Sequence, residues 1–369
     1  MKKQILTILT IGLILGAIFA SVEIAYAAST PEGCIAFTSS KEFTVSLGNG
    51  EAIKTWGGTV QFSTDGTNWE DYTIETTVTS VKPPNGEYSV FFRGIGNNRI
   101  CDYPTGTHFQ LNGENIACSG NIENLLDYTV VQENNHPEMI GYAFYKLFYN
   151  CKNLTEAPEL PATKLAQNCY DSMFKFCESL TKAPELPATK MSFSCYNSMF
   201  MCCSSLTDAP ELPATTLNEF CYDSMFYACH SLTVPPALPA TTLPRQCYYF
   251  MFGYTGIKLS DKFGVSNDGD LYGLPYRIPE EGNGTNGSKS MDLMFYNTKG
   301  PFTDKPRINT TYYLGTPGWT GSGTEEDPFV ISTTEGWNAL AELVNDGHDM
   351  EDLFFALGEN IVVTDMVGT

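Results

Sequence analysis

Residues 169–189 read CYDSMFKFCESLTKAPELPAT, and this stretch decides the fold because the chain repeats it. It returns as CYNSMFMCCSSLTDAPELPAT at 195–215 and as CYDSMFYACHSLTVPPALPAT at 221–241, and AFYKLFYNCKNLTEAPELPAT precedes it at 143–163. The motif LPAT begins at Leu160, Leu186, Leu212 and Leu238, which gives a constant 26-residue period. A fixed period in this range predicts a solenoid, in which each repeat forms one coil and buries its apolar face against its neighbours.

The pattern inside one repeat predicts the local structure of a coil. Four side chains lie at positions i, i+4, i+5 and i+8, the spacing of one stripe on a short helix: Cys169, Met173, Phe174 and Cys177. Leu180 then opens a short strand that Pro184 ends. The following ELPAT segment is expected to bend the chain and to bury Leu186. Each coil is thus predicted to be a short strand, a bend and a helical turn.

The recurring columns Met-Phe, Cys, Leu-Thr, Ala-Pro and LPAT resemble the 26-residue repeats of bacterial surface proteins related to the BspA-like leucine-rich repeats. The resemblance covers about residues 143–259. It implies a leucine-rich-repeat solenoid in an extracellular or cell-surface protein that binds other macromolecules, for example in adhesion. It carries no catalytic residue over to this chain.

Eight of the twelve cysteines fall in two columns at the repeat period: Cys151, Cys177, Cys203 and Cys229, and Cys169, Cys195, Cys221 and Cys247. A column spreads its cysteines along the solenoid axis, about 4.8 Å apart from coil to coil. This disfavours a zinc site, whose four ligands must converge on one point. It also disfavours disulfides between coils, because the Cβ atoms of a disulfide lie roughly 3.8 Å apart. We therefore expect buried thiols that act as small hydrophobic side chains. If a disulfide forms, two of Cys34, Cys101 and Cys118 are the candidates, and the sequence leaves open which two.

Residues 1–27 have the pattern of a secretory signal peptide. Lys2 and Lys3 precede an apolar run, and Ala25-Tyr26-Ala27 offers the small residues that a signal peptidase accepts. An N-terminal membrane anchor is the alternative. No later run reaches the roughly 18 apolar residues of a membrane span. Removing the leader changes the formal charge from −21 to −22, and so acidic a surface disfavours nucleic acid and anionic membranes as partners.

The flanking segments predict further modules. Period-two apolar runs separated by Gly, Asn, Asp and Pro predict an all-β sandwich at residues 28–130, with strands around Val45, Val60, Val90 and Phe109. The solenoid is assigned to 131–315 and a Gly/Pro/Ser/Thr-rich linker to 316–328. A short module at 329–369, either truncated or a small cap, is expected to contain a helix and three strands, the last at residues 361–363. The predicted fold class is therefore an α/β solenoid, leucine-rich-repeat-like, preceded by an all-β sandwich and followed by a short α+β fragment.

Two columns beside the predicted strand keep their polarity while their residue types vary, which indicates exposure to solvent. They supply the candidate binding face, formed by Glu156, Glu159, Lys182, Glu185, Asp208 and Glu211. Stacked coils would array these side chains as an acidic ladder for a basic partner, and a plain solvated surface is the alternative.

No nucleophile, base and acid group together in the sequence, so we expect a non-enzymatic binding protein that is secreted or on the cell surface, without a metal or cofactor. Its ligand would be an extracellular protein or glycan. The rival hypotheses are an accessory part of a carbohydrate-active enzyme whose C-terminal β-helix module is truncated, and a structural surface-layer spacer.

Overall fold

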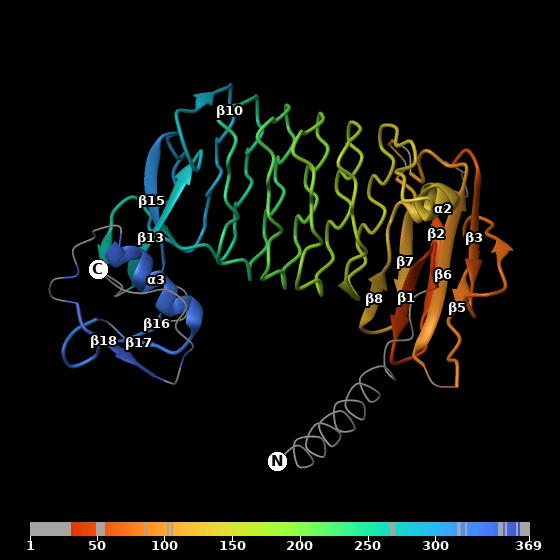
Figure 1. Ribbon diagram of the computed structural model, residues 1–369, viewed down its shortest axis with the longest axis horizontal. Helices are drawn as coiled ribbons and strands as arrows, with labels where there is room; N and C mark the ends of the chain where they lie inside the picture. Colours follow the sequence, from red (N-terminus) through yellow and green to blue (C-terminus); the bar gives the residue numbers. More distant parts are fainter. Residues whose placement is uncertain are drawn as a thin grey trace, which may run out of the picture.

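The computed structural model describes residues 31–48, 56–84, 86–101, 103–104, 106–265, 270–315, 319–321, 323–345, 350, 353–358 and 361. The expected signal peptide at residues 1–27 lies outside them. The molecule is elongated, with a row of stacked coils between a group of β-sheets near the N-terminus and a second group of elements near the C-terminus (Figure 1). We refer to the row, residues 143–298, as the coil stack.

The N-terminal sheets form a sandwich, and the strands β1, β2 and β6 each contain three or four consecutive buried residues. The first sheet has the order β4-β3-β6-β1-β8-β9 and the second the order β5-β2-β7. The strands are β1 (Ile35–Ser39), β2 (Thr44–Gly48), β3 (Thr59–Ser63), β4 (Glu70–Asp71), β5 (Val78–Thr79), β6 (Tyr88–Ile95), β7 (His108–Asn112), β8 (Ile116–Ser119) and β9 (Leu154–Glu156). The four runs that the sequence marks as strands are β2, β3, β6 and β7.

Aromatic rings join the two sheets. Phe37 of β1 contacts Phe109 of β7 at 4.8 Å between ring centroids, and Phe92 of β6 contacts Phe109 at 5.3 Å. Helix α2 (Asn124–Gln132) packs beside β6, where Gly94 is required because a Cβ there would collide with the carbonyl oxygen of Leu125. Strand β8 pairs in parallel with β9, which belongs to the first coil. The sandwich sheet therefore continues into the coil stack and covers its first apolar end.

Backbone hydrogen bonds tie each coil to the next. Within the segment 168–177, every second residue donates to a carbonyl of the following coil: the N–H of Tyr170 donates to Cys195 O at 3.0 Å and the N–H of Phe174 to Met199 O at 2.9 Å. The residues between them donate within their own coil, as Met173 does to Tyr170 O at 3.2 Å. Because half of the N–H groups stay in the coil and half reach its neighbour, coils stack without forming a continuous strand in this segment.

The prediction of a helical turn at residues 169–177 is wrong. Every fourth residue there has a positive φ, namely Asn168 at 53°, Ser172 at 56° and Phe176 at 65°, so the chain forms consecutive tight turns instead of a helix. A four-residue turn repeat places i, i+4 and i+8 on one side, as a 3.6-residue helix does over so short a stretch. The predicted strand is also reduced: β9 forms it in the first coil, while the second and third coils share the isolated bridge Lys182–Asp208 there.

The positive φ angles give a testable consequence for stability. Ala228 has φ of 59°, a region that costs a residue with a Cβ about 1–2 kcal/mol and costs glycine almost nothing. We expect Ala228→Gly to raise the free energy of unfolding by about 0.5–1 kcal/mol, measured by urea denaturation. Ala237→Gly is the matched control, since Ala237 is exposed and is not among the residues with positive φ, and it should lower stability. If both changes altered the free energy of unfolding equally, the positive φ of Ala228 would not be a source of strain.

The core of the coil stack contains two ladders of stacked rings. Phenylalanines of successive coils lie 5.2–5.8 Å apart between centroids, in the order Phe148, Phe174, Phe200, Phe226, Phe252 and Phe295. A second ladder contains Phe144, Tyr170, Tyr196, Tyr222 and Tyr248 at 5.6–5.9 Å. Phe109 of the sandwich continues the first ladder at 5.4 Å from Phe148, and Tyr276 meets its other end at 6.3 Å from Phe295. One aromatic core thus runs from the sandwich through the coil stack to β13.

The elements after the regular repeats are mainly β. They comprise β10 (Thr242–Leu243), β11 (Leu259–Ser260), β12 (Gly264–Val265), β13 (Leu271–Ile278), β14 (Thr285–Asn286), β15 (Thr310–Gly315), β16 (Trp319–Thr320), β17 (Phe329–Ile331), α3 (Thr334–Asn345) and β18 (Phe355–Leu357). The sheet β11-β15-β13-β12 was not predicted.

The C-terminal module matches part of its prediction. Strand β17, helix α3 and strand β18 lie where the sequence places them, whereas the expected last strand at 361–363 falls outside the described residues apart from Ile361. The segment 316–328 is not only a linker, because β16 pairs antiparallel with β17. Trp319 explains this pairing: its ring contacts Phe329 and its indole N–H donates to Gly336 O at 3.0 Å.

Candidate functional site

The APELPAT segment of the first three coils turns its apolar residues inward and its glutamate outward, and the fourth coil has PPALPAT, with the exposed Ala237 in place of the glutamate. The Leu and Ala of every LPAT copy are at most 3% exposed, as in Leu186 and Ala188. Glu185 lies between Pro184 and Pro187 and is exposed. Proline restricts φ to a narrow range and has no N–H to pair, so these segments are stiff and leave the backbone without a continuous ladder. The result is a surface of proline rings and carboxylates that repeats from coil to coil.

All six residues of the predicted binding face are exposed, and they line two grooves in this surface. The first groove has a volume of about 780 Å³ between the first and second coils, and Glu156, Glu159, Lys182 and Glu185 line it. The second has about 740 Å³ between the third and fourth coils and is lined by Asp208 and Glu211, among others. The structure thus divides the expected ladder into two sites.

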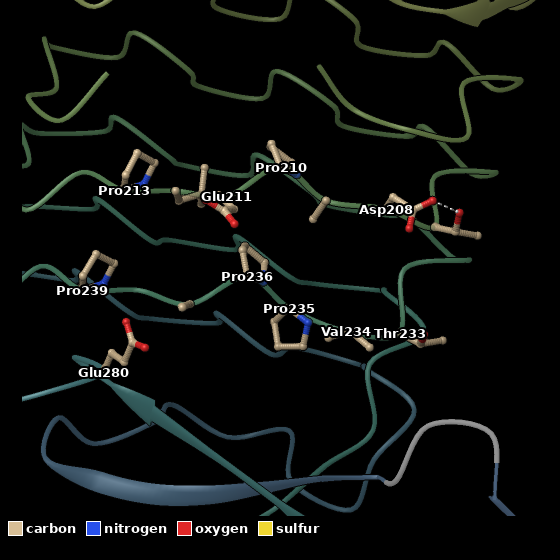
Figure 2. A pocket seen from close by; sticks show the side chains of 14 residues that line it. Asp208, Pro210, Glu211, Pro213, Thr233, Val234, Pro235, Pro236, Pro239 and Glu280 are labelled. Carbon is tan, nitrogen blue, oxygen red and sulfur yellow. Dashed lines mark hydrogen bonds between the residues drawn. The ribbon is translucent and has the colours of Figure 1, made fainter. Parts of the chain in front are cut away.

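The second groove is bounded by two rows of proline rings, as Figure 2 shows. Pro210 and Pro213 form one row, and Pro236 and Pro239 form the row below it. Glu280, which follows β13, lies at the lower edge near Pro239. Sequence reasoning missed Glu280 because it lies outside the repeat, and it missed the prolines because their recurrence was interpreted as architecture alone.

A backbone contact between the second and third coils separates the grooves. Lys182 and Asp208 form a parallel bridge, and the N–H of Ala183 donates to Asp208 O at 3.1 Å. The N–H of Thr207 donates in the opposite direction, to Thr181 O at 2.9 Å. Lys182 lines the first groove and Asp208 the second, so this bridge lies on the boundary between them.

The two grooves differ in charge. The first is lined by three glutamates and Lys182, while the second is lined by Asp208, Glu211 and Glu280 and by no basic residue. Both grooves are therefore net acidic, and their proline-rich walls need little reordering when a ligand binds. Such a surface fits an extended segment with Lys or Arg side chains, whose apolar stems can lie along the proline rings while their charged ends reach the carboxylates.

The cysteine columns are buried, as predicted, and all twelve cysteines are free thiols. The structure adds a role that the sequence did not reveal: each thiol of one column donates to the phenylalanine carbonyl of the preceding layer at 3.1 Å, from Cys151, Cys177, Cys203 and Cys229 to Phe109, Phe148, Phe174 and Phe200. Burial raises the pKa of these thiols, which keeps them protonated and able to donate. Cys34, Cys101 and Cys118 are also buried thiols.

Other kinds of site receive no support from the described ranges. Among the residues with described positions, no three His, Cys, Asp or Glu side chains gather where they could hold a metal ion. In the same part of the chain, none of the helices combines the length and apolar character needed to cross a membrane.

The comparisons with known proteins give no match: no family model fits the chain, and no curated protein and no solved structure is significantly similar to it. The assignment to BspA-like leucine-rich repeats, and the binding function that it implies, therefore stay predictions.

Proposed function

We propose that this chain is a secreted or cell-surface binding protein without catalytic activity, whose coil stack is a solenoid of the leucine-rich-repeat type. The two acidic grooves bind a basic extracellular protein, and binding of this kind would serve adhesion. The observation that carries the proposal is that all six residues of the candidate binding face line two preformed, proline-walled grooves.

The charge of the whole chain supports the same kind of partner. A formal net charge of −21 attracts basic proteins over a distance and speeds their association, while salt weakens this attraction. The grooves then supply the specific contacts, because a stiff surface loses little conformational entropy on binding. The proposal is tested by screening the chain against an array of extracellular-matrix proteins and glycans, with poly-L-lysine as a defined basic probe. Absence of saturable binding to every basic protein and to poly-L-lysine would contradict it.

Neutralising the first groove is expected to weaken this binding. The variant Glu156→Gln/Glu159→Gln/Glu185→Gln removes three exposed charges, each worth about 0.2–1 kcal/mol in an ion pair, so the affinity for poly-L-lysine at low salt should fall about fivefold. Biolayer interferometry at increasing salt measures the effect, and the difference from the unmodified chain should shrink as salt rises.

The matched control removes the same charge elsewhere. Glu87→Gln/Glu325→Gln/Glu326→Gln changes three exposed glutamates that do not line either groove, so only the long-range attraction is reduced. If this control lost as much affinity as the groove variant, the binding would depend on net charge alone and the grooves would not be the site.

A further inference from the structure

The fourth coil differs from the first three at both polar columns of the candidate binding face. Val234 and Ala237 stand where the earlier coils have charged residues, and both are exposed, Val234 to 51%. The residues that they replace are Glu156, Lys182 and Asp208 in one column and Glu159, Glu185 and Glu211 in the other. A lone exposed valine is common on protein surfaces, but here two neighbouring charged columns become apolar together in the lining of the second groove.

The second groove therefore has one acidic wall and one apolar wall. The third coil supplies the acidic wall, with the carboxylates of Asp208 and Glu211 (Figure 2). The fourth coil supplies the apolar wall, formed by Val234, Ala237 and three prolines. Glu280 adds a third carboxylate at the lower edge of the groove. The first groove has charged residues from both of its coils instead.

Hydrogen bonds hold both walls in place. The hydroxyl of the buried Tyr276 in β13 donates to Pro236 O at 3.1 Å, and the N–H of Glu280 donates to Leu238 O at 3.0 Å, so the apolar wall is anchored to the elements after the repeats. The acidic wall is anchored on its other side by the backbone bridge to the second coil. A ligand that enters the groove therefore causes little reordering of the walls.

An extended peptide suits two such walls because its successive side chains point in opposite directions. One set of alternate side chains then faces the carboxylates, and the other set faces the valine and the prolines. Lys or Arg in the first set forms charge-assisted hydrogen bonds, and an aliphatic side chain in the second set removes apolar area from water. An acidic ligand would meet three carboxylates in a groove that no basic residue lines. Charge and apolar area together select a segment in which basic and aliphatic residues alternate.

We propose that the second groove recognises an extended segment of about six residues in which Lys or Arg alternates with an aliphatic residue. The length follows from the walls, because residues 207–213 and 233–239 flank the groove and an extended ligand of this size runs along them. The inference rests on the proposed function, since it names the kind of basic segment that this groove binds. The first groove, with Lys182 among its glutamates, binds basic segments without this preference.

Synthetic hexapeptides with the sequences KVKVKV, KSKSKS and KKKVVV test the proposal. All of them carry the same charge, and the first and the last also have the same composition, so only the alternation of lysine and valine distinguishes these two. Fluorescence polarisation of the labelled peptides with the full chain should give an affinity for KVKVKV about fivefold higher than for either of the others, as partial burial of the valine side chains implies.

Variants of the chain locate the preference. Val234→Ser should lower the affinity for KVKVKV about threefold and leave that for KSKSKS unchanged. Val81→Ser is the matched control, because Val81 is 49% exposed in the sandwich and lines neither groove, and it should bind both peptides as the unmodified chain does. Asp208→Asn/Glu211→Gln/Glu280→Gln should weaken the binding of both peptides about fivefold at low salt.

Equal affinities for the three peptides would overturn the proposal, as would equal effects of Val234→Ser and Val81→Ser. Both results leave the proposed function standing, because basic ligands still bind the chain. If none of the peptides binds, the proposal is likewise overturned, and if poly-L-lysine also fails to bind, the proposed function is contradicted as well. The first-groove variant Glu156→Gln/Glu159→Gln/Glu185→Gln should keep the preference for KVKVKV, and its loss there would place the preference in the wrong groove.

Discussion

Phe200→Ala is expected to lower the free energy of unfolding by about 3–5 kcal/mol, the largest effect among our predictions. Phe200 is fully buried at the centre of the phenylalanine ladder, 5.6 Å from Phe174 and 5.8 Å from Phe226, with its ring within 6° of parallel to both. Truncation opens a cavity that borders two other coils, and it removes two stacking contacts of about 0.5–1.5 kcal/mol each, which are part of this total.

The loss of stability should first affect the coils next to Phe200, because each coil contacts only its neighbours. Hydrogen exchange should accelerate at the amides of Phe174 and Phe226, which donate to Met199 and Met251. Urea denaturation followed by near-ultraviolet circular dichroism measures the loss of stability. Phe193→Ala is the control, since this exposed ring contacts Phe220 at the surface and should cost under about 1 kcal/mol. A cost for Phe200→Ala no larger than this would show that the ladder does not stabilise the coil stack.

The periodic part of the sequence predicts which side chains are buried better than it predicts the backbone. A residue type that recurs at the same position of every repeat is expected in the core that the coils share. Cys169, Cys195 and Cys221 are fully buried, as this expects. The backbone of the same segment was misjudged because a four-residue turn repeat and a helix place the same side chains inward over so short a segment. What separates them is the positive φ of every fourth residue, and Ser172 and Phe176 give no sign of it because neither is glycine.

For the candidate site too, the sequence predicts which residues are exposed but not how the backbone groups them. The exposed acidic residues could be found because they vary at fixed positions, but their division into two grooves depends on backbone pairing at Lys182 and Asp208. Glu280 joins the second groove only because the insertion after the fifth repeat returns to the fourth coil, where the N–H of Glu280 donates to Leu238 O at 3.0 Å. Tyr296, whose ring contacts Tyr254 at 5.5 Å, is likewise displaced from the 26-residue register by this insertion, so a search at a fixed period does not align it with Tyr227.

Asp223→Asn is expected to stabilise the chain at neutral pH and to remove a pH dependence. Burial raises the pKa of Asp223 to about 6, and the nearby Asp171 adds to the rise. A carboxyl group with a raised pKa favours the folded state while it is protonated, so its contribution is lost as the pH increases from about 4 to about 6. The rise corresponds to roughly 3 kcal/mol, which partial exposure to water reduces to about 2 kcal/mol.

The repeat itself supplies the reason to expect that asparagine fits. Asn197 holds the equivalent position in the preceding coil and accepts a hydrogen bond from Ser198 Oγ at 2.9 Å, as Asp223 accepts one from Ser224. Urea denaturation between pH 4 and pH 8 should therefore show Asp223→Asn and the unmodified chain equal at pH 4, and the variant about 2 kcal/mol more stable at pH 7. The reverse change, Asn197→Asp, adds a carboxylate between Asp171 and Asp223 and should lower stability at pH 7 but not at pH 4. Parallel pH profiles of Asp223→Asn and the unmodified chain would show that Asp223 is ionised without cost in the folded protein.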